Sequence, residues 1–195
     1  MKVAVIKYNA GNIRSVAFAL ERLGIDFIIT DVPEEIQSAD RVIFPGVGEA
    51  SSTMRYLKNK KLDQVIIDLH QPTLGICLGM QLMCRHSEEN DTTCLGIFDE
   101  SVKFFSSESL KVPHMGWNSL EKIRGWLPTS LEKKYVYFVH SYYVPLSTHT
   151  VTETTYGISF SAALRKDNFY AVQFHPEKSA EVGEIILQSF FNSPA

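Results

Sequence analysis

Residues Pro72–Met83, P-T-L-G-I-C-L-G-M-Q-L-M, contain the pattern from which the fold can be predicted. The apolar residues before Cys77 predict a buried strand, and those after it predict a helix. Gly75 and Gly79 flank Cys77 as G-x-C-x-G, the cysteine form of the nucleophile elbow, where glycines avoid clashes in a tight turn. Helix N–H groups directed at the sulfur would favour the thiolate. The alternative is a structural cysteine in an ordinary glycine-rich turn.

Strands and helices alternate on the N-terminal side of this turn. Strands are predicted at residues 3–6, 25–29 and 41–44. Helices are predicted from residue 12 to Gly24, from Pro33, and from 51 to 69 with a break at 59–61. This alternation implies right-handed crossovers and a parallel sheet.

The C-terminal half has a different pattern, with many short β-rich runs separated by turn residues. These runs lie at 102–105, 119–123, 135–139, 158–164 and 170–174, and a final helix is predicted at 180–191. They suggest an antiparallel extension of the same sheet. We therefore predict an α/β fold with a mostly parallel central sheet flanked by helices, flavodoxin-like, in a single domain covering residues 1–195.

Composition excludes several classes of protein. The chain has 195 residues, enough for one well-buried domain, and its 45% apolar and 21% charged residues argue against disorder. A net charge of −3 without a long basic run argues against nucleic-acid binding. No apolar run is long enough to span a membrane, and Met1 leads directly into a strand rather than a signal peptide. Three cysteines without a C-x-x-C pair fit a reducing cytoplasm.

A nucleophilic cysteine needs a base, and His175 is the best candidate among the six histidines. It ends a predicted strand, and Pro176 behind it favours an extended conformation. In an extended chain Glu177 would lie on the same side as the imidazole, giving a Cys-His-acid triad. The alternative for H-P-E alone is a loop at a strand end. Among the others, His114 and His140 have more crowded sequence contexts than His70, His86 and His149.

Two motifs together, G-I-C-L-G-M-Q at 75–81 and Q-F-H-P-E at 173–177, resemble those of the class I (triad) glutamine amidotransferases. Further motifs resemble the glutaminase subunits of imidazole glycerol phosphate synthases: 8–16, Pro45-Gly46-Val47-Gly48, 113–118, 137–142 and 177–179. They run from the first strand to the last helix, so the resemblance covers essentially the whole chain. The chain departs from the family pattern at Lys7, usually an acid, and at Asn9-Ala10, in a loop usually richer in glycine.

The resemblance implies glutamine hydrolysis, in which Cys77 attacks the side-chain amide, His175 transfers protons and Glu177 orients His175. The backbone N–H of Leu78, first in the helix after the elbow, is one candidate oxyanion donor. The N–H of Val47 would be the second, because its loop resembles the family's oxyanion loop. The alternative for that loop is a plain βα turn. The residues implied to hold the glutamine are Gly46, Gly48, Gln81, Ser141 and Tyr142.

The resemblance also implies a partner, a cyclase subunit with a (β/α)₈ barrel that forms a one-to-one heterodimer with this chain and receives its ammonia. Asn12, Trp117 and Lys178 lie in motifs that resemble the partner-facing rim. The peptide between Gly46 and Val47 can rest with its N–H turned away from the site, which would make hydrolysis dependent on the partner. We expect no cofactor, no metal, no nucleic acid and no membrane.

Three other interpretations remain. The first is a stand-alone cysteine hydrolase or chaperone-like α/β protein, although those lack a downstream H-P-E. The second is a non-catalytic scaffold subunit, against which the intact Cys77, His175 and Glu177 argue. The third is a glutaminase that serves a different synthase, such as one making pyridoxal phosphate.

Overall fold

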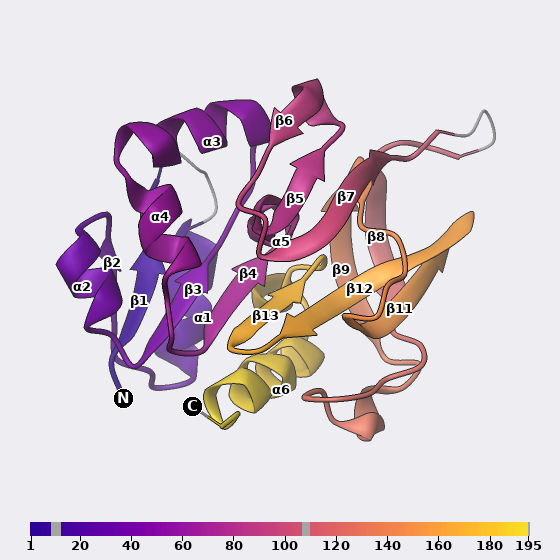
Figure 1. Cartoon of the computed structure of the whole chain (residues 1–195). Helices are drawn as coiled ribbons and strands as arrows, with labels where there is room; N and C mark the ends of the chain where they lie inside the picture. The colour runs from indigo at the N-terminus through magenta and orange to yellow at the C-terminus, as the bar shows by residue number, and fades with distance from the viewer. Residues whose placement is uncertain (9–12, 107–109, 195) are drawn as a thin grey trace.

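The computed structural model describes residues 1–8, 13–106 and 110–194, and a seven-stranded sheet lies at its centre (Figure 1). In sheet order the strands are β11 (Thr150–Tyr156), β12 (Ile158–Lys166), β13 (Phe169–Val172), β4 (Thr73–Ile76), β3 (Arg41–Phe44), β1 (Val3–Ile6) and β2 (Phe27–Thr30). The five strands from β13 to β2 are parallel, whereas β12 and β11 extend the sheet in antiparallel fashion. This confirms the predicted mostly parallel sheet with an antiparallel extension.

Helices cover both faces of this sheet. They are α1 (Ile13–Arg22), α2 (Pro33–Gln37), α3 (Ala50–Asn59), α4 (Leu62–Ile67), α5 (Leu78–Met83) and α6 (Ala180–Phe191). Alternate residues of β1 point to opposite faces, so Val3 packs with α1 and α6 while Ala4 packs with α2 to α5. No helix in the described ranges is both long and apolar enough to cross a membrane.

The remaining strands form two smaller sheets, so the expectation that every C-terminal strand extends the central sheet was wrong. One sheet has the order β10 (Tyr142–Tyr143), β7 (Phe98–Phe104), β5 (Cys84–Ser87) and β6 (Thr92–Thr93). The other is a hairpin of β8 (His114–Ser119) and β9 (Tyr135–His140). The hairpin packs through Phe138 against Phe160 of β12, with 5.9 Å between ring centroids. Just after β8 the chain also bonds to the edge strand β11, where Glu121 and Glu153 exchange backbone hydrogen bonds of 2.8 and 2.9 Å.

The register of the central sheet brings three loops to one edge. Ile76 at the end of β4 pairs with Val172 at the end of β13, and Gly75 pairs with Phe44 at the end of β3. The segments that follow contain Cys77, His175 and the Pro45–Gly48 loop. They meet at the carboxyl ends of parallel strands, where open α/β folds bind their ligands.

Candidate active site

The turn between β4 and α5 has the geometry of a nucleophile elbow. Cys77 adopts φ 52° and ψ −106°, a backbone conformation that is costly for a residue with a side chain. Close packing favours both flanking glycines: a Cβ on Gly79 would lie 2.0 Å from the carbonyl oxygen of Phe44, and one on Gly75 would lie 3.0 Å from backbone atoms of Gly79 and Met80. The Cys77 N–H donates to the Val172 oxygen at 2.8 Å, which ties the elbow to β13.

The structure places His175 and Glu177 in direct contact. Nδ1 of His175 lies 2.7 Å from Oε1 of Glu177, and both side chains are 1% exposed. The extended chain predicted here is wrong, because residues Pro176–Lys178 form a 3₁₀ turn, and this turn brings the two side chains together. The hydroxyl of Ser179 donates to the His175 carbonyl at 2.7 Å and holds this turn closed.

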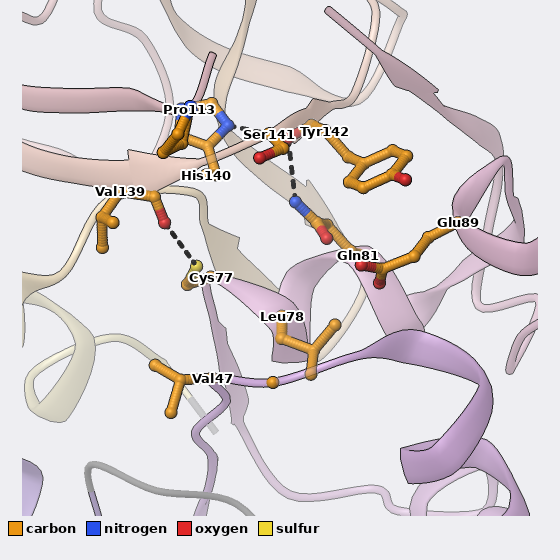
Figure 2. Close-up of a pocket in the computed structure, with 11 residues that line it drawn as sticks. Val47, Cys77, Leu78, Gln81, Glu89, Pro113, Val139, His140, Ser141 and Tyr142 are labelled. Atoms are coloured by element: carbon orange, nitrogen blue, oxygen red, sulfur yellow. Dashed lines mark hydrogen bonds between the residues drawn. The ribbon is translucent and has the colours of Figure 1, made fainter.

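The electrostatic environment favours a protonated His175. Burial alone would lower the pKa of this imidazole, but the negative charge of a Cys77 thiolate, together with the Glu177 carboxylate, raises its pKa to about 10. The sulfur also accepts from Nε2 of Gln173 at 3.7 Å, and it lies 3.9 Å from the Val139 oxygen (Figure 2). An imidazolium beside the sulfur stabilises the thiolate form that acts as a nucleophile.

A pocket of about 310 Å³ opens over Cys77 (Figure 2). It is lined by Val47, Gly48, Cys77, Leu78, Gln81, Glu89, Pro113, Val139, His140, Ser141 and Tyr142. The structure therefore gathers six of the residues predicted from sequence around the sulfur. Gly46 is not among the lining residues: a Cβ there would lie 2.5 Å from the Tyr8 hydroxyl and 2.7 Å from Cβ of Leu78. Its place is beneath the pocket, where only glycine fits.

The two proposed oxyanion donors do not point into the pocket together. The Leu78 N–H donates to the Gly46 oxygen at 3.3 Å. In a trans peptide the carbonyl of Gly46 and the N–H of Val47 point in opposite directions, so the Val47 N–H is turned away from Leu78. Rotation of this one peptide would release the Leu78 donor and turn the Val47 donor towards it.

Glu89 is a pocket residue that the sequence interpretation missed. It lies in the 3₁₀ turn Glu89–Asp91, and its Oε2 accepts from the Ala50 N–H at 2.8 Å. Burial raises the pKa of this carboxyl group, the Ala50 N–H partly offsets that, and the nearby Glu49 raises it further. The only signal in the sequence was an acid pair, Glu88-Glu89, twelve residues beyond the elbow.

The predicted partner residues that the structure describes lie close together on the outer side of the β8–β9 hairpin. The Trp117 ring lies edge-on to Tyr137, with 6.1 Å between centroids, and Nζ of Lys178 lies 5.9 Å from the Tyr137 ring. Met115 and Trp117 are 63% and 53% exposed, although both are large and apolar. Asn12 lies outside the described residues. In the described part of the chain, no group of three or more His, Cys, Asp or Glu side chains could hold a metal ion.

Comparison with known proteins agrees with this geometry. The family model for glutamine amidotransferase class-I matches residues 4–193. The imidazole glycerol phosphate synthase subunit HisH of Bacteroides fragilis (strain YCH46) is 60% identical over 97% of this chain and 98% of its own length. The subunit of the same name from Bacteroides thetaiotaomicron is 59% identical over 98% of this chain and its own full length. Among solved structures, a glutamine amidotransferase superposes with a TM-score of 0.76 at 18% identity, over 97% of this chain and 96% of that one, which supports the fold alone.

Proposed function

The chain belongs to the class-I glutamine amidotransferase family, and we propose that it is the glutaminase subunit of an imidazole glycerol phosphate synthase. One structural observation carries the activity. A buried Cys77 sits on a strained turn above the sheet edge, electrostatically coupled to the His175–Glu177 pair, whose two side chains are 2.7 Å apart. The near full-length similarity to subunits named HisH supports the assignment to this synthase.

The triad can carry out both halves of the reaction. The Cys77 thiolate attacks the side-chain carbonyl of glutamine, and His175, which is protonated at neutral pH, gives its proton to the departing nitrogen. Ammonia leaves, and a γ-glutamyl thioester remains on the sulfur. The neutral imidazole then takes a proton from the attacking water, and release of glutamate restores thiolate and imidazolium. Glu177 orients His175 throughout.

The pocket also offers groups for the amino-acid end of glutamine. Glu89 places a carboxylate in the lining, suited to the substrate's α-ammonium group. The Gln81 side chain and the backbone at Ser141 and Tyr142 lie on the neighbouring wall (Figure 2). Gly48, the last residue of the proposed oxyanion loop, lines the pocket as well. The substrate would thus be held by its charged end while its amide reaches Cys77.

The Gly46–Val47 peptide is the proposed switch. In the present orientation the Gly46 carbonyl accepts the hydrogen bond of the Leu78 N–H, and the Val47 N–H is turned away. The tetrahedral intermediate would therefore lack both backbone donors. Loss of one such donor typically costs about 3–4 kcal/mol of transition-state stabilisation. The Tyr8 hydroxyl donates to the Pro45 oxygen at 2.5 Å and holds the peptide before it, which confines the rotation to Gly46–Val47. We therefore expect low activity until a partner favours the rotated state.

The proposed partner is a cyclase subunit with a (β/α)₈ barrel, bound one-to-one. Free ammonia is protonated near neutral pH, so direct transfer to the partner avoids the loss of the nucleophile. The exposed Met115 and Trp117, with Lys178 beside them, offer an apolar surface with a positive charge at its margin for this contact. By resemblance Asn12, which lies outside the described residues, would also contact the partner.

Glutamate release by the purified chain tests the function, measured alone and with the cyclase and its nucleotide ligand. Activity should be very low alone and rise by orders of magnitude in the liganded complex. Absence of glutamate release in that complex would refute the glutaminase assignment. Equal turnover with and without the partner would refute only the switch.

Val47→Pro isolates the switch, because proline removes the proposed donor N–H and leaves the triad in place. Partner-induced activation should be lost in this variant. Val47→Ala is the matched control: it shortens the side chain but keeps the N–H, so activation should persist. Full activation of Val47→Pro would exclude the Val47 N–H as an oxyanion donor.

A further inference from the structure

Two buried histidines lie beside the pocket, and the mechanism above does not use them. His114 begins β8 and His140 ends β9, where they pair directly in register. Nδ1 of His114 lies 3.0 Å from Nε2 of His140, and the two residues are only 3% and 6% exposed. His140 lines the pocket that contains Cys77 (Figure 2).

The hydrogen bonds fix which ring nitrogens carry protons. Nδ1 of His140 lies 2.7 Å from the Tyr142 oxygen, and a carbonyl oxygen can only accept, so His140 donates from Nδ1. Burial lowers the pKa of His140 to about 3 and that of His114 to about 4, so both rings are neutral. Nε2 of His140 therefore accepts, and His114 donates to it from Nδ1. Asn118 completes the series, since its Nδ2 lies 3.4 Å from Nε2 of His114.

The series ends on the carbonyl of Tyr142, which receives a second donor from the catalytic side. Nε2 of Gln81 donates to this oxygen at 2.9 Å and to Oε1 of Gln173 at 3.0 Å. Gln173 in turn contacts the sulfur of Cys77. The Tyr142 carbonyl is thus held by donors from the β8–β9 hairpin and from helix α5 together.

We propose that His114 is a positioning residue for glutamine binding: through His140 it holds the Tyr142 carbonyl, and with it the Ser141–Tyr142 backbone, in the orientation that receives the substrate. The inference rests on the proposed glutaminase function. Packing alone does not account for an imidazole here, because His114 is stacked between Tyr156 and Phe138, at centroid distances of 4.1 and 4.9 Å. A phenyl ring would fill that place without burying polar nitrogens.

Two substitutions separate positioning from packing. His114→Phe keeps the aromatic stack and loses the N–H, whereas His114→Asn loses the stack but keeps a donor nitrogen near the position of Nδ1. In the complex with cyclase and nucleotide ligand, His114→Phe should raise the KM for glutamine about tenfold, as expected for one lost buried hydrogen bond, with little change in kcat. His114→Asn should recover most of the KM despite a lower melting temperature.

The opposite order, with KM following melting temperature rather than the donor, would overturn the proposal and leave a packing role. An unchanged KM in a folded His114→Phe protein would overturn it as well, while wild-type turnover would still support the glutaminase function. If neither variant folds, nitrogen-15 chemical shifts of the wild-type histidines decide. Protons on Nδ1 of both rings are expected, and a proton on Nε2 of His114 would exclude the donation to His140. This measurement does not depend on catalysis.

Discussion

His140 and His175 lie near the same Cys77 sulfur and both are almost fully buried, yet their pKa values shift in opposite directions. Burial lowers the pKa of His140 to about 3, and the Tyr142 carbonyl that accepts its N–H offsets this only in part. His175 is buried at least as deeply, but the charged sulfur and the Glu177 carboxylate raise its pKa to about 10. Burial alone therefore neutralises an imidazole here, and negatively charged neighbours reverse that effect.

The difference in pKa suggests different roles for the two imidazole rings. In the proposed mechanism, His175 is the ring that exchanges protons with the substrate, because the charged sulfur of Cys77 and the Glu177 carboxylate keep it protonated. His140 remains neutral with a fixed tautomer, which suits a group that orients a backbone carbonyl. Removing the negative neighbours of His175 should make it resemble His140.

The largest effect should follow from removing the sulfur. Cys77→Ala should abolish glutamine-dependent turnover while the protein still folds and binds its partner, because the change is small and local. The pKa of His175 should fall in this variant, since the charge of the sulfur no longer stabilises the imidazolium. Enzyme assays and NMR titration of His175 measure the two effects.

The matching control is the synthase reaction supplied with ammonium salts. Cys77→Ala should support that reaction, because the cyclase site is untouched. Glutamine-dependent turnover that persists in the variant would exclude Cys77 as the nucleophile.

Glu177→Gln should come next in size. It keeps the shape of the side chain but removes the charge that favours the imidazolium, so the pKa of His175 should fall. Activity should decrease on the order of 10²- to 10³-fold, less than for His175→Ala, since an orienting group usually contributes less than the base itself. Equal and complete loss in both variants, with intact folding, would mean that Glu177 does more than orient His175.

Glu89 is a second carboxylate in the pocket, and unlike Glu177 it accepts from a backbone N–H, that of Ala50, rather than contacting an imidazole. If it binds the α-ammonium group of glutamine, Glu89→Gln should raise KM about 10- to 100-fold with a much smaller change in kcat. Glu88→Gln is the matched control, because Glu88 bonds Lys103 and the Phe104 N–H and does not line the pocket. Similar KM values for the two variants would exclude Glu89 from substrate binding.

The proximity of the proposed triad residues could be predicted from the sequence because their signals are local. G-x-C-x-G specifies a tight turn around Cys77, and H-P-E puts an acid two residues from His175. Even so, the extended conformation predicted at Glu177 was wrong, because a 3₁₀ turn brings Glu177 into contact with His175.

Features that depend on contacts between distant residues could not be predicted in this way. Glu89 reaches the pocket only because β5 leaves helix α5 and returns through a turn beside Ala50. The His114–His140 contact requires the register of a hairpin whose strands are separated by fifteen residues. The hydrogen bond from the Leu78 N–H to the Gly46 carbonyl likewise could not be predicted from a glycine-rich loop. Each of these depends on tertiary packing rather than on the order of neighbouring residues.

The smallest expected effect is on stability, where the two kinds of histidine should act at opposite ends of the pH range. His114 and His140 have folded-state pKa values near 4 and 3, below the ordinary 6.5, so the unfolded chain binds more protons than the folded protein below pH 6.5. Their contribution to stability should therefore be lost as pH falls from 6.5 towards these values. His175, raised to about 10, contributes stability that is complete below 6.5 and is lost as pH rises towards 10.

Denaturant unfolding of the isolated chain at pH values between 6.5 and 5 measures the contribution of the two buried histidines. At lower pH the carboxylates also change the unfolding free energy; Glu49, for example, has a pKa of about 2 in the folded protein against an ordinary 4.5. The slope of unfolding free energy against pH reflects how many more protons the unfolded chain binds than the folded protein. In His114→Phe this number should decrease by about one, because one imidazole with a lowered pKa has been removed. His175→Gln is the control: it should leave the acid slope in place and reduce the loss of stability above pH 6.5. An unchanged acid slope in His114→Phe would mean that His114 takes up its proton near pH 6.5 in the folded protein. The neutral ring required for its donation to His140 would then be absent under mildly acidic conditions, and the contrast with His175 would fail at that position.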